Sequence, residues 1–206
     1  MKRRTMAYAA TALVLIPTGI FAEQGEVKAA RQQQKEERKE HWQQQRQENQ
    51  EFRKTLKDKV SEEKATAVQS HRETQYQENK AFRSQMHEKN MEFLKGRLAK
   101  NSKLTDAQKN ELVNYFENQY QENVSFRDQR HSDNVAFFEK IANDPNMTQE
   151  QKKAALKAHF AEEKVKTKEH VQQQKEDHRA EKEKIRSEVR AQSQGAVAPS
   201  AGAENR

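Results

Sequence analysis

The chain has no cysteine, which excludes disulfide bonds and cysteine-ligated metal centres. It has only five glycines and three prolines among its 206 residues, too few for the tight turns of a sheet-rich fold. Apolar residues make up 32% of the chain, and a segment near the N-terminus holds a disproportionate share of them. The remainder is poor in core material, so we expect packing between two copies, as a homodimer, to complete the burial of apolar surface.

Strong helix formers dominate the composition. Glu, Lys, Gln, Arg and Ala fill most of the chain, and 34% of the residues are charged. We therefore predict an all-α fold of four long helices in helical hairpins, elongated or curved, that forms an antiparallel dimer. The expected helices cover about 26–59, 62–100, 106–143 and 149–190. The break near residue 60 is weak, and the alternative is one continuous helix over the first two segments.

The N-terminal residues have the pattern of a secretory signal peptide. A basic segment at residues 2–4 precedes an apolar segment at 6–22, which ends in a small residue suited to cleavage. We predict a signal peptide at 1–22, a helical domain at 23–194 and a disordered tail of Gly, Ala, Pro and Ser at 195–206.

The alternative for this segment is an uncleaved membrane anchor, but Pro17 and Gly19 interrupt its short apolar run. We therefore expect a periplasmic protein with no stable membrane insertion after cleavage. Cleavage after Ala22 removes three of the 39 basic residues and none of the 32 acidic ones, which leaves a net charge of +4. Because charges of both signs alternate along the chain, this mild excess does not predict nucleic-acid binding.

The helical part repeats itself. The segment YQENKAFR at 76–83 returns 44 residues later as YQENVSFR at 120–127, and Asn and Phe also recur at a spacing of eleven residues, which is three helical turns. The Asn-x-x-Phe-Arg unit predicts either an adhesive surface for partner proteins or a helix interface whose asparagines pair with one another to fix register. If it is an adhesive surface, the client-binding residues are Phe82, Arg83, Met86, Phe93, Tyr120, Phe126, Arg127 and Phe137.

Catalytic and metal-binding motifs are not evident. The chain has seven histidines, but no two have the close spacing of an HExxH motif, so we expect most of them to be solvated and predict no metal site. We find no nucleophile elbow, phosphate-binding loop or paired catalytic carboxylates. The prediction is a protein that is not an enzyme and has no cofactor.

Two short motifs have the chemistry of helix starts. Leu104-Thr105 is followed by Gln108, and Met147-Thr148 is followed by Gln151. A threonine at the N-cap accepts a hydrogen bond from the first turn, and a glutamine three residues later reaches back to the N–H of the cap. These motifs predict helices that begin at Asp106 and Gln149.

In a secreted, cysteine-free helical chain, these two motifs resemble the LTxxQ motif of the Spy/CpxP family of periplasmic proteins. The second copy has methionine in place of leucine, and the resemblance covers roughly residues 75–170. It implies a hairpin-rich monomer in a curved antiparallel dimer, whose basic and apolar concave face binds unfolding proteins without ATP. It also implies that Leu104, Thr105, Gln108, Met147, Thr148 and Gln151 shape the helix ends. The internal repeats, the long first and fourth helices and the dense glutamine content depart from the family pattern.

The sequence therefore predicts an ATP-independent periplasmic chaperone that binds unfolded or misfolded proteins and limits their aggregation during envelope stress. One alternative is a structural helical-repeat protein that docks or spaces envelope components. Another, implied by relatives in the same family, is a metal-responsive periplasmic sensor.

Overall fold

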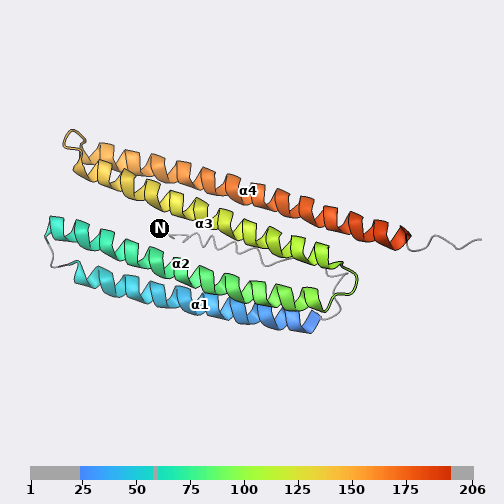
Figure 1. Cartoon of the computed structure of the whole chain (residues 1–206). Coiled ribbons are helices and arrows are strands. Elements are labelled where there is room, and N and C mark those ends of the chain that lie inside the picture. The colour runs from blue at the N-terminus through green and yellow to red at the C-terminus, as the bar shows by residue number, and fades with distance from the viewer. Residues whose placement is uncertain (1–23, 58–59, 196–206) are drawn as a thin grey trace, which may run out of the picture. The chain divides into compact units, whose positions relative to one another are not determined.

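The computed structural model describes residues 24–57 and 60–195, and this part of the chain is helical almost throughout (Figure 1). Its helices are α1 (Gln24–Thr55), α2 (Ser61–Ala99), α3 (Asp106–Asn143) and α4 (Gln149–Gly195). The described residues contain no strand. The all-α prediction with four long helices is confirmed, whereas the predicted signal peptide at 1–22 and the tail beyond Gly195 lie outside the described residues.

The helix boundaries follow the local chemistry of the sequence. Helix α3 has the predicted bounds, and α4 starts at Gln149 as predicted but continues to Gly195, about one turn past the expected end. Helix α1 ends at Thr55 and α2 begins at Ser61, so the alternative of one continuous helix is wrong.

The chain separates into two compact units that divide at Leu98, near the end of α2. The first unit is a hairpin in which α2 runs antiparallel to α1 (Figure 1). Hydrogen bonds set its register, because they join Gln34 to Asn90 near the open end and Asn49 to His71 near the turn. That the two units act as one domain over 23–194 stays a prediction.

The second unit is a hairpin of α3 and α4. Its side-chain bonds join Gln108 to Glu188 at one end of α3 and Asn134 to His159 toward the other end. Because Glu188 lies opposite the first turn of α3, the last residues of α4 extend past the start of α3. Each hairpin is therefore a pair of long antiparallel helices held by contacts at regular intervals.

Both predicted capping boxes form. The Thr105 Oγ1 accepts from the Gln108 N–H at 3.2 Å, and the Gln108 Oε1 accepts from the Thr105 N–H at 3.0 Å. Thr148 and Gln151 make the same reciprocal pair at 3.2 and 2.8 Å. These bonds satisfy donors that a helix start leaves without an intrahelical partner, which explains why α3 and α4 begin where they do.

The core is thin for a chain of this length. The buried apolar side chains come from α2, α3, α4 and the α2–α3 connection: Met86, Met91, Leu94, Leu98, Leu104, Leu112, Phe116, Ile141 and Ile185. Helix α1 contributes none, and its buried side chains are the amides of Gln34 and Gln45. Polar contacts therefore carry much of the pairing between α1 and α2.

Among residues 24–57 and 60–195, none of the helices has an apolar stretch sufficient to cross a membrane.

Candidate functional site

Four clusters of the same composition join the two helices within each hairpin. Two clusters lie between α1 and α2, and two lie between α3 and α4. In each, a histidine of one helix contacts the side-chain oxygen of an asparagine on the facing helix and stacks on the phenylalanine three residues after that asparagine. We refer to them as the His–Asn–Phe clusters. Their members are His41 with Asn79 and Phe82, His71 with Asn49 and Phe52, His159 with Asn134 and Phe137, and His170 with Asn123 and Phe126.

The geometry of the clusters is nearly constant. The distances from the imidazole Nε2 to the asparagine Oδ1 are 3.0, 3.1, 2.6 and 3.1 Å in the order given. The ring centroids are 3.8 to 4.0 Å apart, and the rings lie within 15° of parallel. A shared arrangement at four places shows that the repeat in the sequence encodes a repeat of contacts.

The asparagine bonds decide which imidazole nitrogen carries a proton. Asn79, for example, donates from Nδ2 to the backbone carbonyl of Gln75 at 2.7 Å, and Asn49 and Asn123 make the same bond one turn back. A carbonyl only accepts, so the other amide atom, which faces the histidine, is the oxygen. The histidine Nε2 is then the donor in these three clusters.

A glutamine one turn after the histidine completes two of the clusters. Asn79 donates to the Oε1 of Gln45 at 3.2 Å, and Asn123 donates to that of Gln174 at 2.8 Å. The asparagine side chain thus links a histidine, a glutamine and its own helix, and it fixes the register of the hairpin.

The His159 cluster has an ion pair in the corresponding place. The Oε2 of Glu163 accepts from the Nε of Arg130 at 2.6 Å, and its Oε1 lies 3.1 Å from the Nζ of Lys166. Only 4% of the Glu163 side chain is exposed. Burial alone raises the pKa of this carboxyl, but the hydrogen bonds from the two cations outweigh it and hold the pKa of Glu163 below its usual range.

Two histidines of the second hairpin, His170 and His178, are poorly suited to carry charge. Burial lowers the pKa of His170, and the nearby Arg127 and Arg130 lower it further, against the opposing effect of Glu122. Burial likewise lowers the pKa of His178, with a smaller effect from Lys182. His178 lies against Tyr115 and Phe116, with ring centroids 6.3 and 5.9 Å away.

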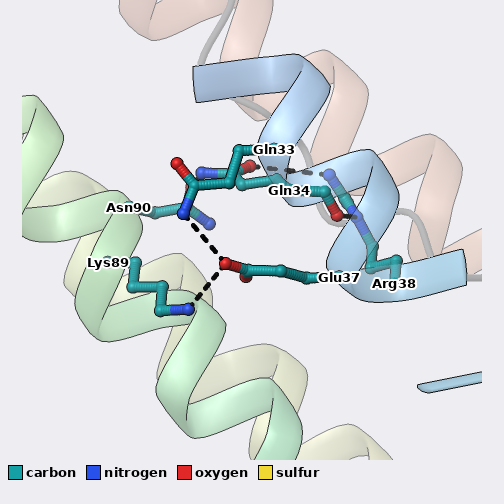
Figure 2. A network of polar contacts seen from close by, with 6 residues as sticks. All are labelled: Gln33, Gln34, Glu37, Arg38, Lys89 and Asn90. Atoms are coloured by element: carbon teal, nitrogen blue, oxygen red, sulfur yellow. Dashed lines mark hydrogen bonds and ion pairs between the residues drawn. The ribbon is translucent and has the colours of Figure 1, made fainter. Parts of the chain in front are cut away.

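A polar network near the start of α1 adds further contacts between α1 and α2, beyond the two His–Asn–Phe clusters of this hairpin (Figure 2). Gln34 of α1 donates to the Asn90 Oδ1 of α2 at 2.5 Å, so a glutamine takes the place that histidine has elsewhere. One turn away, Lys89 pairs with Glu37 at 2.8 Å, and this hydrogen bond lowers the pKa of the Glu37 carboxyl. The hairpin is thus closed by amides and charges at this end also.

The predicted client-binding residues are divided between the two hairpins, four on α2 and four on α3. Phe82, Phe126 and Phe137 are half-buried, and the histidine of each cluster covers one face of the ring. Phe93 is also half-buried, with the Arg97 guanidinium 5.7 Å from its ring centroid. Three further predicted residues are half-buried: Arg83, Tyr120 and Arg127.

Three sequence interpretations need correction. Met86 is only 3% exposed, so it is a core residue and not a surface one. The cluster asparagines bond to histidines across the hairpin and not to one another, because the facing helix places a histidine opposite each of them. For the same reason the four cluster histidines belong to the helix interface and are not simply solvated.

Phe160 is an exposed aromatic residue that was not predicted as a candidate site. Its ring is 54% exposed and lies 6.0 Å from that of Phe138, at the end of a group of rings that includes Phe137 and His159. Lys157 and Lys164, three residues before and four after Phe160, share its helix face and are exposed. The spacing of lysines around a phenylalanine on α4 was the available signal.

The cluster histidines do not converge on a common point. Within residues 24–57 and 60–195, no group of three or more His, Asp or Glu side chains is placed to hold a metal ion. Comparisons with protein-family models, with curated proteins and with solved structures give no match to this chain.

Proposed function

We propose that the protein is an ATP-independent chaperone of the periplasm that binds unfolded or misfolded proteins and limits their aggregation. The observation that carries this proposal is the face of α4 around Phe160, where a ring 54% exposed lies between two exposed lysines. A phenylalanine with about half of its surface exposed forgoes part of the free energy of burial, and a partner that covers the ring gains that part.

The composition of this face suits unfolded chains better than one folded partner. An apolar ring accepts apolar side chains of many shapes, and lysines on flexible stems attract carboxylates without demanding one geometry. Binding of this kind needs neither a nucleotide nor a pocket. Release follows when the client folds and withdraws its apolar side chains.

The capping boxes lend further support through the family resemblance. Both copies of the motif form the reciprocal bonds expected of helix starts in an LTxxQ-type hairpin protein. The periplasmic location and the homodimer are part of the same proposal and rest on the sequence pattern.

An aggregation assay tests this function. Light scattering of a thermally denaturing client is recorded with and without the full chain, with Phe160→Ser, and with the matched control Gln173→Ser on the same helix. We expect the wild-type chain and the control to suppress scattering at equimolar ratio and Phe160→Ser to protect less. Equal scattering with and without the wild-type chain would contradict the proposal.

A structural or docking role is the second candidate. The observation in its favour is the constant geometry of the His–Asn–Phe clusters, which fix the register of each helix pair. A surface that binds many unfolded clients does not need helices held in so exact a register. A docking protein should bind one partner at a fixed stoichiometry and should not protect unrelated clients. The metal-responsive alternative has less support, because four histidines already bond to asparagine oxygens.

A further inference from the structure

The two helices of the first hairpin carry the same recognition sequence. On α1 it is His41, Gln45, Asn49 and Phe52, and on α2 it is His71, Gln75, Asn79 and Phe82. The order and spacing are identical, His-x3-Gln-x3-Asn-x2-Phe, although most of the residues between them differ. Each copy spans twelve residues, or just over three helical turns.

This sequence is complementary to itself when two copies run antiparallel. The histidine of α1 then lies opposite the asparagine and phenylalanine of α2, and the histidine of α2 lies opposite those of α1. Both contacts are present, with His41 bonded to Asn79 at 3.0 Å and His71 bonded to Asn49 at 3.1 Å. The stacks on Phe82 and Phe52 match as well, at 4.0 and 3.9 Å. The interface therefore has the symmetry that is ordinarily found between two identical subunits.

Helix α1 brings little apolar core of its own to its pairing with α2. Helix α1 has no buried apolar side chain, and its pairing depends on amides, imidazole stacks and ion pairs. Gln45 and Gln75 each have a buried Nε2 without an acceptor in the described part of the chain. Buried donors without an acceptor destabilise the state that contains them, so the closed hairpin holds α1 less firmly than a fully bonded interface would.

We propose that a second copy of this chain is the partner that this surface recognises, and that two copies exchange α1 to form a homodimer. In the exchanged pair, α1 of each copy lies against α2 of the other and makes the same His–Asn–Phe clusters. No contact of the interface is lost, because a second chain supplies the same residues in the same order. This proposal rests on the helix pairing alone and is independent of the chaperone activity.

Single cysteines in this cysteine-free chain distinguish exchange from a closed hairpin. One tagged full chain carries Gln34→Cys on α1 and a second, differently tagged, carries Asn90→Cys on α2, since these side chains are 2.5 Å apart. The two chains are mixed, incubated and treated with a short bis-maleimide crosslinker. Exchange predicts a crosslinked species that contains both tags, while neither chain alone gives crosslinked dimers.

Controls make each outcome decisive. A single chain that carries both Gln34→Cys and Asn90→Cys is the positive control, because it shows whether the two positions can be crosslinked at all. The pair Gln45→Cys and Asn79→Cys repeats the mixing test at a second contact, where the amides are 3.2 Å apart. Gln44→Cys, on the exposed face of α1, should give no product with Asn90→Cys. Light scattering of the wild-type chain gives the solution mass. A monomer at every concentration, or a dimer without the mixed crosslink, would overturn the proposal.

Discussion

At the scale of single residues, the histidines are the most informative side chains. Each cluster histidine satisfies an asparagine oxygen with its Nε2 and covers a phenylalanine with its ring, so one side chain provides both polar and apolar contact. The stacked imidazole shields the ring that the sequence analysis assigned to clients. Aromatic residues in such a repeat therefore serve the helix pair before they can serve a partner.

The stability of the second hairpin should fall as the solution becomes acidic. The pKa values of His170 and His178 are lowered from the ordinary 6.5, so the unfolded state takes up protons first as the pH falls below that value. The free energy of unfolding should therefore decrease over the window in which the pH falls below about 6.5, since protonation there favours the unfolded chain.

Urea unfolding followed by circular dichroism at several pH values measures this effect. Replacement of both residues, His170→Gln with His178→Gln, should flatten the pH dependence in that window even if it lowers stability at pH 7. An unchanged slope in the double variant would show that other groups cause the pH dependence.

Loss of the Arg130 cation alone should lower the stability of the second hairpin more than replacement of both Arg130 and Glu163 by neutral residues. Arg130→Met leaves an almost fully buried carboxylate with only Lys166 as partner, and we expect a loss of about 1–3 kcal/mol. The neighbouring cluster has Gln119 and Gln174 at the equivalent places, eleven residues away along each helix.

Arg130→Gln combined with Glu163→Gln should therefore recover most of that loss, because it copies the neutral arrangement of the adjacent cluster. Urea denaturation of the single and double variants supplies the comparison. A double variant as unstable as Arg130→Met would mean that the ion pair itself stabilises the hairpin.

At the scale of elements, the helix starts were predictable and the helix pairing was not. Thr105 with Gln108 and Thr148 with Gln151 make bonds within one turn, so residues close in sequence determine them. The His41–Asn79 contact joins residues 38 positions apart, and it depends on which helix faces which. The identical spacing of the two copies on α1 and α2 was a signal of this pairing, but a repeat along the chain does not determine which copies face each other.

The two capping boxes should differ in their contribution to stability. Gln108 is 5% exposed and also donates to the Glu188 Oε2 of α4 at 3.1 Å, whereas Gln151 is exposed and bonds only at its own helix start. Gln108→Ala should therefore destabilise the hairpin more than Gln151→Ala, while Thr105→Ala should cost about 1 kcal/mol. Thermal unfolding of the three variants gives the order, and equal losses for the two glutamine variants would contradict the role of Glu188.

At the scale of the whole molecule, two hairpins use the same solution to the shortage of apolar residues. Histidine stacks, amides and buried ion pairs replace much of the usual core, and apolar side chains such as Phe160 and Val165 are left 54% and 53% exposed. A chain built in this way keeps its helices in register and still leaves apolar side chains exposed. The proposed chaperone function follows from this division between polar interior contacts and exposed apolar groups.

A binding measurement with an unfolded chain is the most direct test of the claim that the exposed apolar groups bind unfolded proteins. Fluorescence anisotropy of a labelled, permanently unfolded variant of a small domain is measured during titration with the full chain in the absence of ATP, beside the labelled folded parent. The account predicts saturable binding to the unfolded variant, weaker binding after Phe160→Ser, and no binding to the folded parent. Equal binding to both forms, or to neither, would contradict it.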